Sequence, residues 1–468
     1  MPEESKETSL RQTLREWLAE NALGAYAIVV VTYLIVYASS YLYTVIVARL
    51  LGPSDFSLLA SLLAVGTIVA VGIGGPSQAI IARYVAADTT RGLDSQARYL
   101  VRKALLIIGV VAGVVVVIAL ALSWSIKGWL NSAALLPVLL FAFYMGEYLI
   151  QPVVAGTIQG LQRFRVLSIG YISGAIVRVL LGILLVALGM KVSGAMMAEL
   201  ISGIVLLSLL GVWVKRWMGE GRAEGPIDYS HLKRFAPTVV VTSTCMVAFI
   251  YLDVFLVRGL FSGSQAGYYT AAQKLGTVMY LIPGVFALVL FPRVSASHAK
   301  GISSWAVFAR VEAATAVLCG AVAVFFVAFP EWSIRLVFGS KYLPGATLVP
   351  IFAVAMFCFS LLPVCVQFLM ATDRYGFMYI LVLGIVGEAA AILIFHDTVR
   401  MVAWIVAVTA MGVTLLVGLY TFNDWVSFRR RAAGRLRGDQ LIAAPDSRGE
   451  HAVLELVENA RSRSMEVT

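Results

Sequence analysis

The chain contains 468 residues, of which 60% are hydrophobic and 13% charged, and its formal net charge is +10. Its mean hydropathy of +0.88 excludes a water-soluble globular protein, because the surface of such a protein must carry far more polar side chains. Apolar runs long enough for a helix to cross about 30 Å of hydrocarbon recur along the chain, and they are too long and too uniformly apolar for barrel strands. The composition therefore predicts an all-α polytopic membrane protein.

About twelve membrane-spanning helices are expected, in two lobes of six. The polar segment 1–25 precedes them and is too long and too mixed in charge to begin a cleavable signal peptide, so we expect the first span to remain in the mature protein. The expected spans cover residues 26–50, 56–85, 104–123, 134–159, 166–189, 193–215, 236–260, 266–292, 304–329, 346–371, 375–396 and 399–426. The lobes are then 26–215 and 236–428, with a cytoplasmic linker over 216–235 and a basic cytoplasmic tail over 429–468.

Basic residues concentrate on one side of these spans. Alternate loops contain clusters such as Arg98, Arg102 and Lys103, whereas the loops between them contain few basic residues. Because cytoplasmic loops carry an excess of Lys and Arg, both termini are predicted to lie in the cytoplasm, which an even number of spans also requires. We therefore expect a multi-pass protein of the plasma or inner membrane. A nucleic-acid partner is not expected, since membrane topology accounts for the positive charge.

Sequence motifs for catalysis or metal binding are absent. The cysteines lie in apolar spans without CxxC spacing, the histidines are scattered, and no P-loop, HExxH motif or nucleophile elbow occurs. The sequence therefore predicts neither an enzyme nor a cofactor nor a metal site. The four cysteines, interpreted as packing residues, are Cys245, Cys319, Cys358 and Cys365.

The two predicted lobes contain an internal repeat. Segments 47–67 and 256–277 share one pattern, in which an apolar run ends near an arginine and is followed by a Gly-containing turn and a second apolar run. The aligned pairs are Arg49 with Arg258, Ser57 with Gly267, Gly66 with Gly276, Gly74 with Gly284, Arg83 with Arg293, and Arg163 with Arg374. Six spans return a chain to its starting side, so the halves would be parallel repeats, a transporter plan with the substrate path between them.

Four stretches carry a resemblance to a known family. ARLLGPSDFSLLA at Ala48–Ala60 resembles the signature that ends the first span of polysaccharide exporters, the lipid-linked oligosaccharide flippases of the multidrug/oligosaccharidyl-lipid/polysaccharide (MOP) exporter superfamily. GTIQGLQRF at Gly156–Phe164 closes the fourth span in a similar way. DVFLVRGLFSGSQAGYYTAAQKL at Asp253–Leu275 and LFPRVS at Leu290–Ser295 resemble the start of the second lobe of these exporters.

The resemblance implies a MATE-like bundle of two lobes that opens alternately to each side of the membrane. It implies movement of a polyprenyl-(di)phosphate-linked oligosaccharide from the inner to the outer leaflet, for the assembly of cell-surface polysaccharide. The implied partners are this lipid-linked oligosaccharide, membrane lipids, a coupling ion and the enzymes of polysaccharide assembly.

Basic residues in the spans are candidates for binding phosphate, because a phosphorylated glycan requires a wet cavity with cationic groups. Charged residues within spans usually face such a cavity or one another. Arg178 lies near the centre of the fifth span and Lys274 lies in the eighth, while Glu199 is a further charge in the sixth. Four more candidates lie at span ends, where the alternative is that the charged head reaches the lipid headgroups; they are Arg49, Arg83, Arg258 and Arg293.

Acidic residues in the spans are candidates for binding a coupling ion, or for structural pairing. Glu147 could form a structural ion pair with Arg178, and Asp253 could pair with Lys274 across a helix hairpin. Glu388 occupies nearly the same place in the second lobe as Arg178 in the first. We therefore expect one lobe to present a cation to the phosphate and the other to present an acid to the ion.

Aromatic and glycine residues allow two further expectations. Tyr268, Tyr269 and Tyr280 could stack on sugar rings, although interfacial tyrosines more often form a belt at the membrane surface. Gly170 and Gly174 form a GxxxG motif, which lets helices approach closely and is expected to pack helices within one lobe.

Two other functions are alternatives. A MATE-like cation or drug antiporter would share the fold, but its lumen would be dominated by acids, whereas the candidates here are rich in arginine. A membrane-embedded glycosyltransferase or polymerase would need an outer loop rich in carboxylates or containing histidine. The predicted outer loops are short and poor in both.

Overall fold

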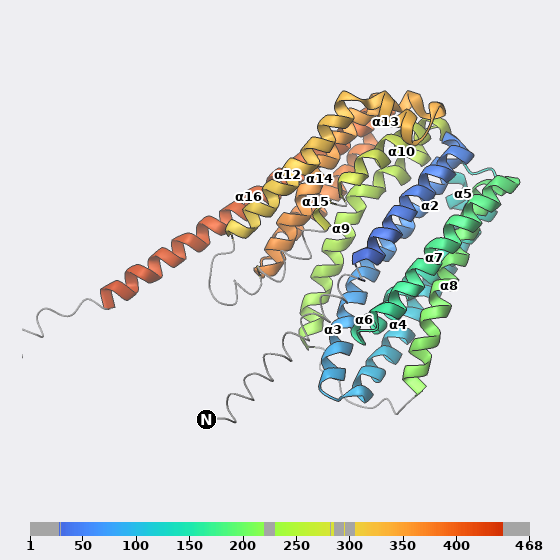
Figure 1. Ribbon diagram of the computed structural model, residues 1–468. Helices are drawn as coiled ribbons and strands as arrows, with labels where there is room; N and C mark the ends of the chain where they lie inside the picture. The colour runs from blue at the N-terminus through green and yellow to red at the C-terminus, as the bar shows by residue number, and fades with distance from the viewer. Residues whose placement is uncertain are drawn as a thin grey trace, which may run out of the picture. The chain divides into compact units, whose positions relative to one another are not determined.

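The computed structural model of the protein describes residues 28, 30–219, 230–280, 282–284, 294 and 305–442. Within these residues the regular structure is entirely helical, as Figure 1 shows. The chain divides into two units, residues 1–414 and residues 415–468. The described part of the second unit continues the last helix. The all-α prediction is confirmed.

The helices follow one another with short connections. In chain order they are a first helix at Val30–Leu51, α2 at Pro53–Val69, a π-helical segment η1 at Ala70–Gly74, α3 at Gly75–Thr90, α4 at Asp94–Ala121, α5 at Ser123–Trp129, α6 at Leu136–Gly160, α7 at Phe164–Leu185, η2 at Val186–Met190, α8 at Lys191–Gly219, α9 at Ser230–Leu260, α10 at Gly263–Gly276, η3 at Thr277–Tyr280, α12 at Trp305–Ala328, α13 at Pro330–Val337, η4 at Ser340–Leu348, α14 at Val349–Ala371, α15 at Phe377–Ile394 and α16 at Val399–Ile442.

Ten helical runs in the described part of the chain are long and apolar enough to cross a membrane. Helix α4 illustrates why they need lipid. Its side chains at Leu106, Val110 and Val117 are all more than half exposed, and exposed apolar side chains of this kind are stable only against hydrocarbon. The protein is therefore a multi-pass membrane protein, as the composition predicted.

Two differences separate these ten runs from the twelve expected spans. The run Phe164–Gly219 contains both the fifth and the sixth expected span, which are divided where Gly189 adopts a φ of 88° between α7 and α8. The eighth expected span, residues 266–292, begins in α10 and η3, and most of its remainder lies outside the described residues.

The two copies of the repeated pattern form equivalent turns. Helix α2 begins at Pro53, after Gly52 with a φ of 77°, a conformation that favours glycine. Helix α10 begins at Gly263, after Ser262, whose hydroxyl oxygen accepts a hydrogen bond from the backbone N–H of Gln265. Both helix starts fall at the same place in the alignment that lays Ser57 on Gly267, so the repeat extends to the local backbone.

The helices of the first unit pack as two groups that meet along a shared seam. Helices α2 to α8 contact one another, and α9, α10, η4, α12, α14 and α15 form a second set of contacts. We call residues 30–219 the first helix group and residues 230–414 the second helix group. The seam is formed by α2, η1 and α3 against α9 and α10, and Figure 1 shows α9 beside α2.

Small residues allow the helices to approach closely. At the seam, a Cβ atom on Gly267 would overlap the carbonyl group of Pro53. Within the first helix group, a Cβ on Gly170 would lie 2.6 Å from Leu210 Cδ2, and one on Gly174 would lie 3.3 Å from the Ser202 carbonyl oxygen. The GxxxG motif therefore packs α7 against α8, which confirms its expected use within one half of the protein.

Candidate functional site

A cavity of about 210 Å³ lies among the first helix, α2, α6, α7, α8, α9 and α10. Its lining residues are Ser40, Tyr43, Thr44, Val47, Phe56, Leu59, Ala60, Leu63, Ala64, Thr67, Tyr144, Tyr148, Arg178, Glu199, Tyr251 and Lys274. Tyr251 and Lys274 come from the second helix group and the others from the first. The cavity therefore lies between the two groups, and its lining combines two cations, one acid and four tyrosines.

Arg178 extends from α7 toward the first helix. One guanidinium nitrogen, Nη2, donates a hydrogen bond to Ser40 Oγ, and Nη1 lies 3.9 Å from Glu199 Oε2 on α8. The guanidinium carbon lies 5.6 Å from the centroid of the Tyr43 ring, a distance typical of a cation–π contact. With 20% of its side chain exposed, Arg178 is held by three residues from two helices and still reaches the cavity.

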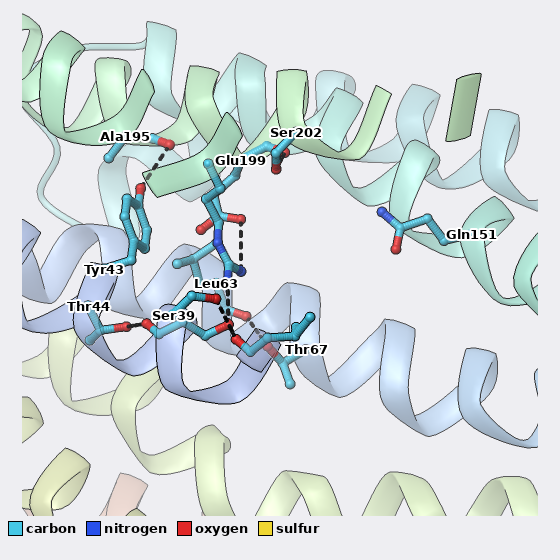
Figure 2. A network of polar contacts seen from close by, with 12 residues as sticks. Ser39, Tyr43, Thr44, Leu63, Thr67, Gln151, Ala195, Glu199 and Ser202 are labelled. Atoms are coloured by element: carbon cyan, nitrogen blue, oxygen red, sulfur yellow. Dashed lines mark hydrogen bonds and ion pairs between the residues drawn. The ribbon is translucent and has the colours of Figure 1, made fainter. Parts of the chain in front are cut away.

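Backbone hydrogen bonds orient the residues that hold Arg178. Ser40 Oγ donates to the Val36 carbonyl at 2.6 Å, so its lone pairs face the guanidinium group. Figure 2 shows the Tyr43 hydroxyl directed at the Ala195 carbonyl, to which it donates at 3.4 Å, with the Glu199 carboxylate nearby. The sequence permits this arrangement because Ser40 and Tyr43 are three residues apart on one helix, a spacing that places them on the same face.

The acid paired with Arg178 is Glu199, and Glu147 lies elsewhere. Glu147 on α6 is 7% exposed and accepts a hydrogen bond from Gln151, one helical turn later. Its carboxylate fills the space beside Gly203, where a Cβ atom would overlap it. The ion pair suggested by the sequence between Glu147 and Arg178 is therefore replaced by the pair of Arg178 with Glu199.

Lys274 reaches the cavity from α10. Its ammonium nitrogen lies 4.6 Å from the centroid of the Tyr251 ring, on α9. Asp253, two residues after that tyrosine on the same helix, is fully buried and does not line the cavity. One of its oxygens, Oδ2, accepts a hydrogen bond from the Tyr269 hydroxyl at 2.8 Å. Lys274 therefore lines the cavity, whereas Asp253 does not.

Glu388 on α15 is sealed from the cavity. It is 1% exposed, and neither carboxylate oxygen has a hydrogen-bond partner among the described residues. Glu312 on α12 has one buried oxygen, Oε2, that also lacks a hydrogen-bond partner among the described residues. In the part of the chain that the structure describes, no group of three or more His, Cys, Asp or Glu side chains could hold a metal ion.

Of the four arginines at span ends, the three that the structure describes do not line the cavity. Arg49 and Arg258 donate hydrogen bonds to backbone carbonyls near the turns that begin α2 and α10. Arg83 is exposed on α3. Arg293 lies outside the described residues.

The tyrosines of the cavity were missed in the sequence. Tyr144 and Tyr148 stand one helical turn apart on α6, with ring centroids separated by 5.0 Å. Of the tyrosines that the sequence suggested for stacking, none lines the cavity, and Tyr269 is used to bond Asp253. The i, i+4 spacing of two tyrosines within a span was the available signal, because such a pair shares one face of a helix.

The arrangement can bind an anion beside rings or hydroxyl-rich groups. Arg178 and Lys274 face the same space from different helix groups, and the tyrosine rings supply flat surfaces with a polar edge. A phosphate can accept hydrogen bonds from a guanidinium group in a planar, two-point arrangement. Glu199, at 3.9 Å, holds Arg178 only loosely and leaves it available to such a ligand.

Comparison with known proteins identifies both the family and the fold. The family model described as "Polysaccharide biosynthesis protein" matches residues 24–298. An inward-facing structure of a multidrug resistance MATE family transporter of the MOP superfamily has a TM-score of 0.70 at 13% identity, covering 83% of this chain and 95% of that chain. None of the curated proteins matches this chain.

Two further solved structures extend the comparison. The eukaryotic MATE transporter AtDTX14 has a TM-score of 0.60 at 16% identity, covering 88% of this chain and 97% of its own. A MOP superfamily transporter from Pyrococcus furiosus, whose binding pocket is described as having reverse polarity, has a TM-score of 0.58 at 12% identity, covering 86% of this chain and 96% of its own. The chain belongs to the polysaccharide biosynthesis protein family, and its fold is that of the MOP superfamily transporters.

Proposed function

We propose that this transporter moves a polyprenyl-phosphate- or polyprenyl-diphosphate-linked oligosaccharide from the inner to the outer leaflet by alternating access of its two helix groups. The family is one of polysaccharide biosynthesis, and the fold is one of transporters. A glycan that bears phosphate cannot cross hydrocarbon unaided, so its head needs a polar passage. The polyprenyl chain would remain in the lipid while the head crosses.

The observation that carries this proposal is the joint presence of Arg178 and Lys274 in one cavity. They come from α7 and α10, that is, from different helix groups. A phosphate bound to both would contact both groups at once, so its binding energy would depend on how the groups are arranged. A ligand shifts a conformational equilibrium only through such differential affinity.

The tyrosine rings suit the sugar part of the same ligand. Tyr144, Tyr148 and Tyr251 present apolar faces with hydroxyl edges around the two cations. Sugar rings have both apolar faces and hydroxyl groups, and they stack on aromatic rings in the same way as other flat, amphipathic groups.

The buried acids are proposed to serve coupling. Glu388, Asp253 and Glu147 are each less than a tenth exposed. Each has at least one carboxylate oxygen without a hydrogen-bond partner among the described residues. Buried acids of this kind are costly, and in membrane proteins they often take part in ion or proton pathways. A coupling ion or proton would therefore act at a distance from Arg178.

The proposed orientation follows from the positive-inside rule. Both termini would lie in the cytoplasm, and the protein would reside in the plasma or inner membrane beside the enzymes of polysaccharide assembly. The turns at Gly52 and Ser262 would then lie at the outer surface. The cavity would deliver its ligand toward that side.

A MATE-like cation or drug antiporter is the second candidate. Glu199 lines the cavity beside Tyr43 and Tyr144, and an acid with aromatic rings can bind an organic cation. The MATE-family fold also supports this reading. The two cations in the same cavity oppose it, because they would repel such a ligand.

The test is flipping in proteoliposomes. One leaflet is loaded with a polyprenyl-diphosphate oligosaccharide, and its exposure to a membrane-impermeant glycosidase is followed with and without protein. Protein-dependent exposure supports the proposal, and it should be lost in Arg178→Ala and Lys274→Ala. If folded protein leaves every glycan protected but exchanges organic cations for an ion gradient, the antiporter is the correct function.

A further inference from the structure

Arg49 joins the two helix groups at the end of the protein where α2 and α10 begin. It lies near the end of the first helix, yet its Nε donates to the carbonyl of Val337 at 2.8 Å and its Nη2 donates to the carbonyl of Leu336. These two carbonyls belong to the last turn of α13, in the second helix group. The last carbonyls of a helix lack partners within the helix and carry partial negative charge, so they attract a cation.

Arg258 makes the reciprocal connection. It lies near the end of α9 in the second helix group, and its Nη2 donates to the carbonyl of Asn131 at 3.3 Å, just after α5 in the first helix group. Its Nη1 donates to Ser57 Oγ on α2 at 3.2 Å. Ser57 Oγ in turn donates to the carbonyl of Gly263 at 3.0 Å, at the start of α10.

The connections made by Arg49 and Arg258 start from equivalent positions in the two copies of the repeated pattern. The sequence alignment already pairs Arg49 with Arg258. The structure adds that each arginine reaches the end of a short helix in the opposite helix group, α13 for Arg49 and α5 for Arg258. Each short helix is followed, two residues after its last residue, by a residue with positive φ, Asn131 at 47° and Gly339 at 90°. The internal repeat therefore produces a pair of crossed contacts.

We infer that Arg49 and Arg258 form a two-part latch that holds the α2 and α10 ends of the helix groups together and releases when the transporter opens there. The inference rests on the proposed function, because release is needed only if the groups separate during transport. It assigns these two arginines to conformational control and leaves Arg178 and Lys274 to the ligand.

The chemistry of the acceptors suits a reversible latch. All the acceptors are neutral oxygens, so separation leaves no buried carboxylate without its partner. Arg258 is 4% exposed, and its Nε has no hydrogen-bond partner among the described residues. When it separates from Asn131, this guanidinium group regains water, which offsets the lost hydrogen bonds. Closed and open states can therefore lie close in free energy.

Other hydrogen bonds join the two helix groups near these arginines. The Tyr342 hydroxyl of η4 donates to the Ala48 carbonyl at 2.6 Å, beside Arg49. Ser61 on α2 donates to the Val254 carbonyl on α9 at 3.1 Å, further along the same seam. The two helix groups are thus tied at several points at this end of the protein, and Arg49 and Arg258 provide the long side chains among these contacts.

The test measures separation of the two groups without any substrate. Spin labels are placed at Ala133 and Lys341, which are exposed in the first and second helix group respectively, after the four native cysteines are changed to alanine. Pulsed electron spin resonance in nanodiscs then gives the distribution of distances between the labels. Arg49→Ala, Arg258→Lys and their combination are compared with the parent, and Arg335→Ala, an exposed arginine on α13, is the matched control.

We expect the combined variant to raise the population of long distances roughly tenfold, the factor that corresponds to 1.4 kcal/mol. Each single variant should have a smaller effect, and Arg335→Ala none. Arg49 is exposed, so Arg49→Ala should fold. This variant therefore tests the latch even if the Arg258 variants fail to fold. An unchanged distribution in folded Arg49→Ala overturns the latch. Because no glycan is present, failure of the proposed substrate leaves this result unaffected.

Discussion

Arg178 and Glu388 hold nearly equivalent places in the repeat and have opposite environments. Arg178 on α7 reaches the cavity and is held by Ser40, Glu199 and the Tyr43 ring. Glu388 on α15 is 1% exposed, and both of its carboxylate oxygens lack hydrogen-bond partners among the described residues. The two residues of this aligned pair thus differ in charge and in access to the cavity.

This difference in environment indicates which of the two side chains suits ligand binding and which suits coupling to an ion or proton. A guanidinium group is delocalised and weakly hydrated, so it tolerates a partly buried place and still binds phosphate. A carboxylate without hydrogen bonds is costly to bury, and stability alone would favour an apolar residue there. Arg178 is therefore suited to hold the ligand, and Glu388 is suited to be a group that changes state.

The largest effect is expected from Arg178→Ala. It removes the cavity cation in the first helix group and leaves Glu199 without its partner at 3.9 Å. Losing one member of a partly buried charge contact costs about 2–5 kcal/mol, so flipping should fall at least roughly 30-fold. The measurement is the initial rate of substrate exposure in proteoliposomes.

Glu199→Gln is the matched control for this variant. It removes the competing acid and keeps Arg178, so flipping should remain within roughly fivefold of the parent, a change of about 1 kcal/mol. Equal losses in both variants would mean that the pair is only structural. The comparison of Arg178 with Glu388 would then lose its functional meaning.

Glu388→Gln is expected to separate coupling from binding. The amide keeps the shape of the side chain but cannot carry a negative charge, so transport should lose its dependence on an ion or proton gradient. Binding of the lipid-linked oligosaccharide, measured by quenching of intrinsic fluorescence, should stay unchanged because Glu388 does not line the cavity. Loss of binding together with retained gradient dependence would reverse the proposed roles.

The spans, the repeat and two cavity cations could be predicted from the sequence, because each depends on local signals. Hydropathy finds helices that must lie in lipid, and the glycines and arginines of the repeat keep their spacing. Span limits were less accurate. Helix α4 begins at Asp94, ahead of the expected start at residue 104, since its charged first turns reduce hydropathy without interrupting the helix.

The partners of the charged residues could not be predicted in the same way. Glu147 and Glu199 are both acids within spans, and only the packing of α8 against α6 and α7 decides which one meets Arg178. Likewise, the hydrogen bond from Arg49 to Val337 depends on how the first helix and α13, which are distant in the sequence, meet in space. Periodicity along one helix contains no information about such contacts.

A smaller effect is expected from Gly203→Ala, which tests whether Glu147 has a fixed place. A Cβ atom at Gly203 would overlap the Glu147 carboxylate, so the acid must move within a packed site. Overpacking of this kind costs about 1–3 kcal/mol, partly offset by the better helix propensity of alanine. Thermal unfolding in detergent should show the loss. Gly211→Ala on the same helix, with no atom within 4 Å of the new methyl group, should show none.

The smallest effect is expected from Tyr43→Phe. The hydroxyl donates to the Ala195 carbonyl at 3.4 Å, which is long for a hydrogen bond, so its loss should cost less than about 1 kcal/mol. The ring that faces Arg178 at 5.6 Å remains, so flipping should stay within roughly twofold of the parent. A tenfold loss of flipping with unchanged thermal stability would show that the hydroxyl touches the ligand. Tyr43 would then belong with Arg178 to the binding surface, and the contrast with the sealed Glu388 would become sharper.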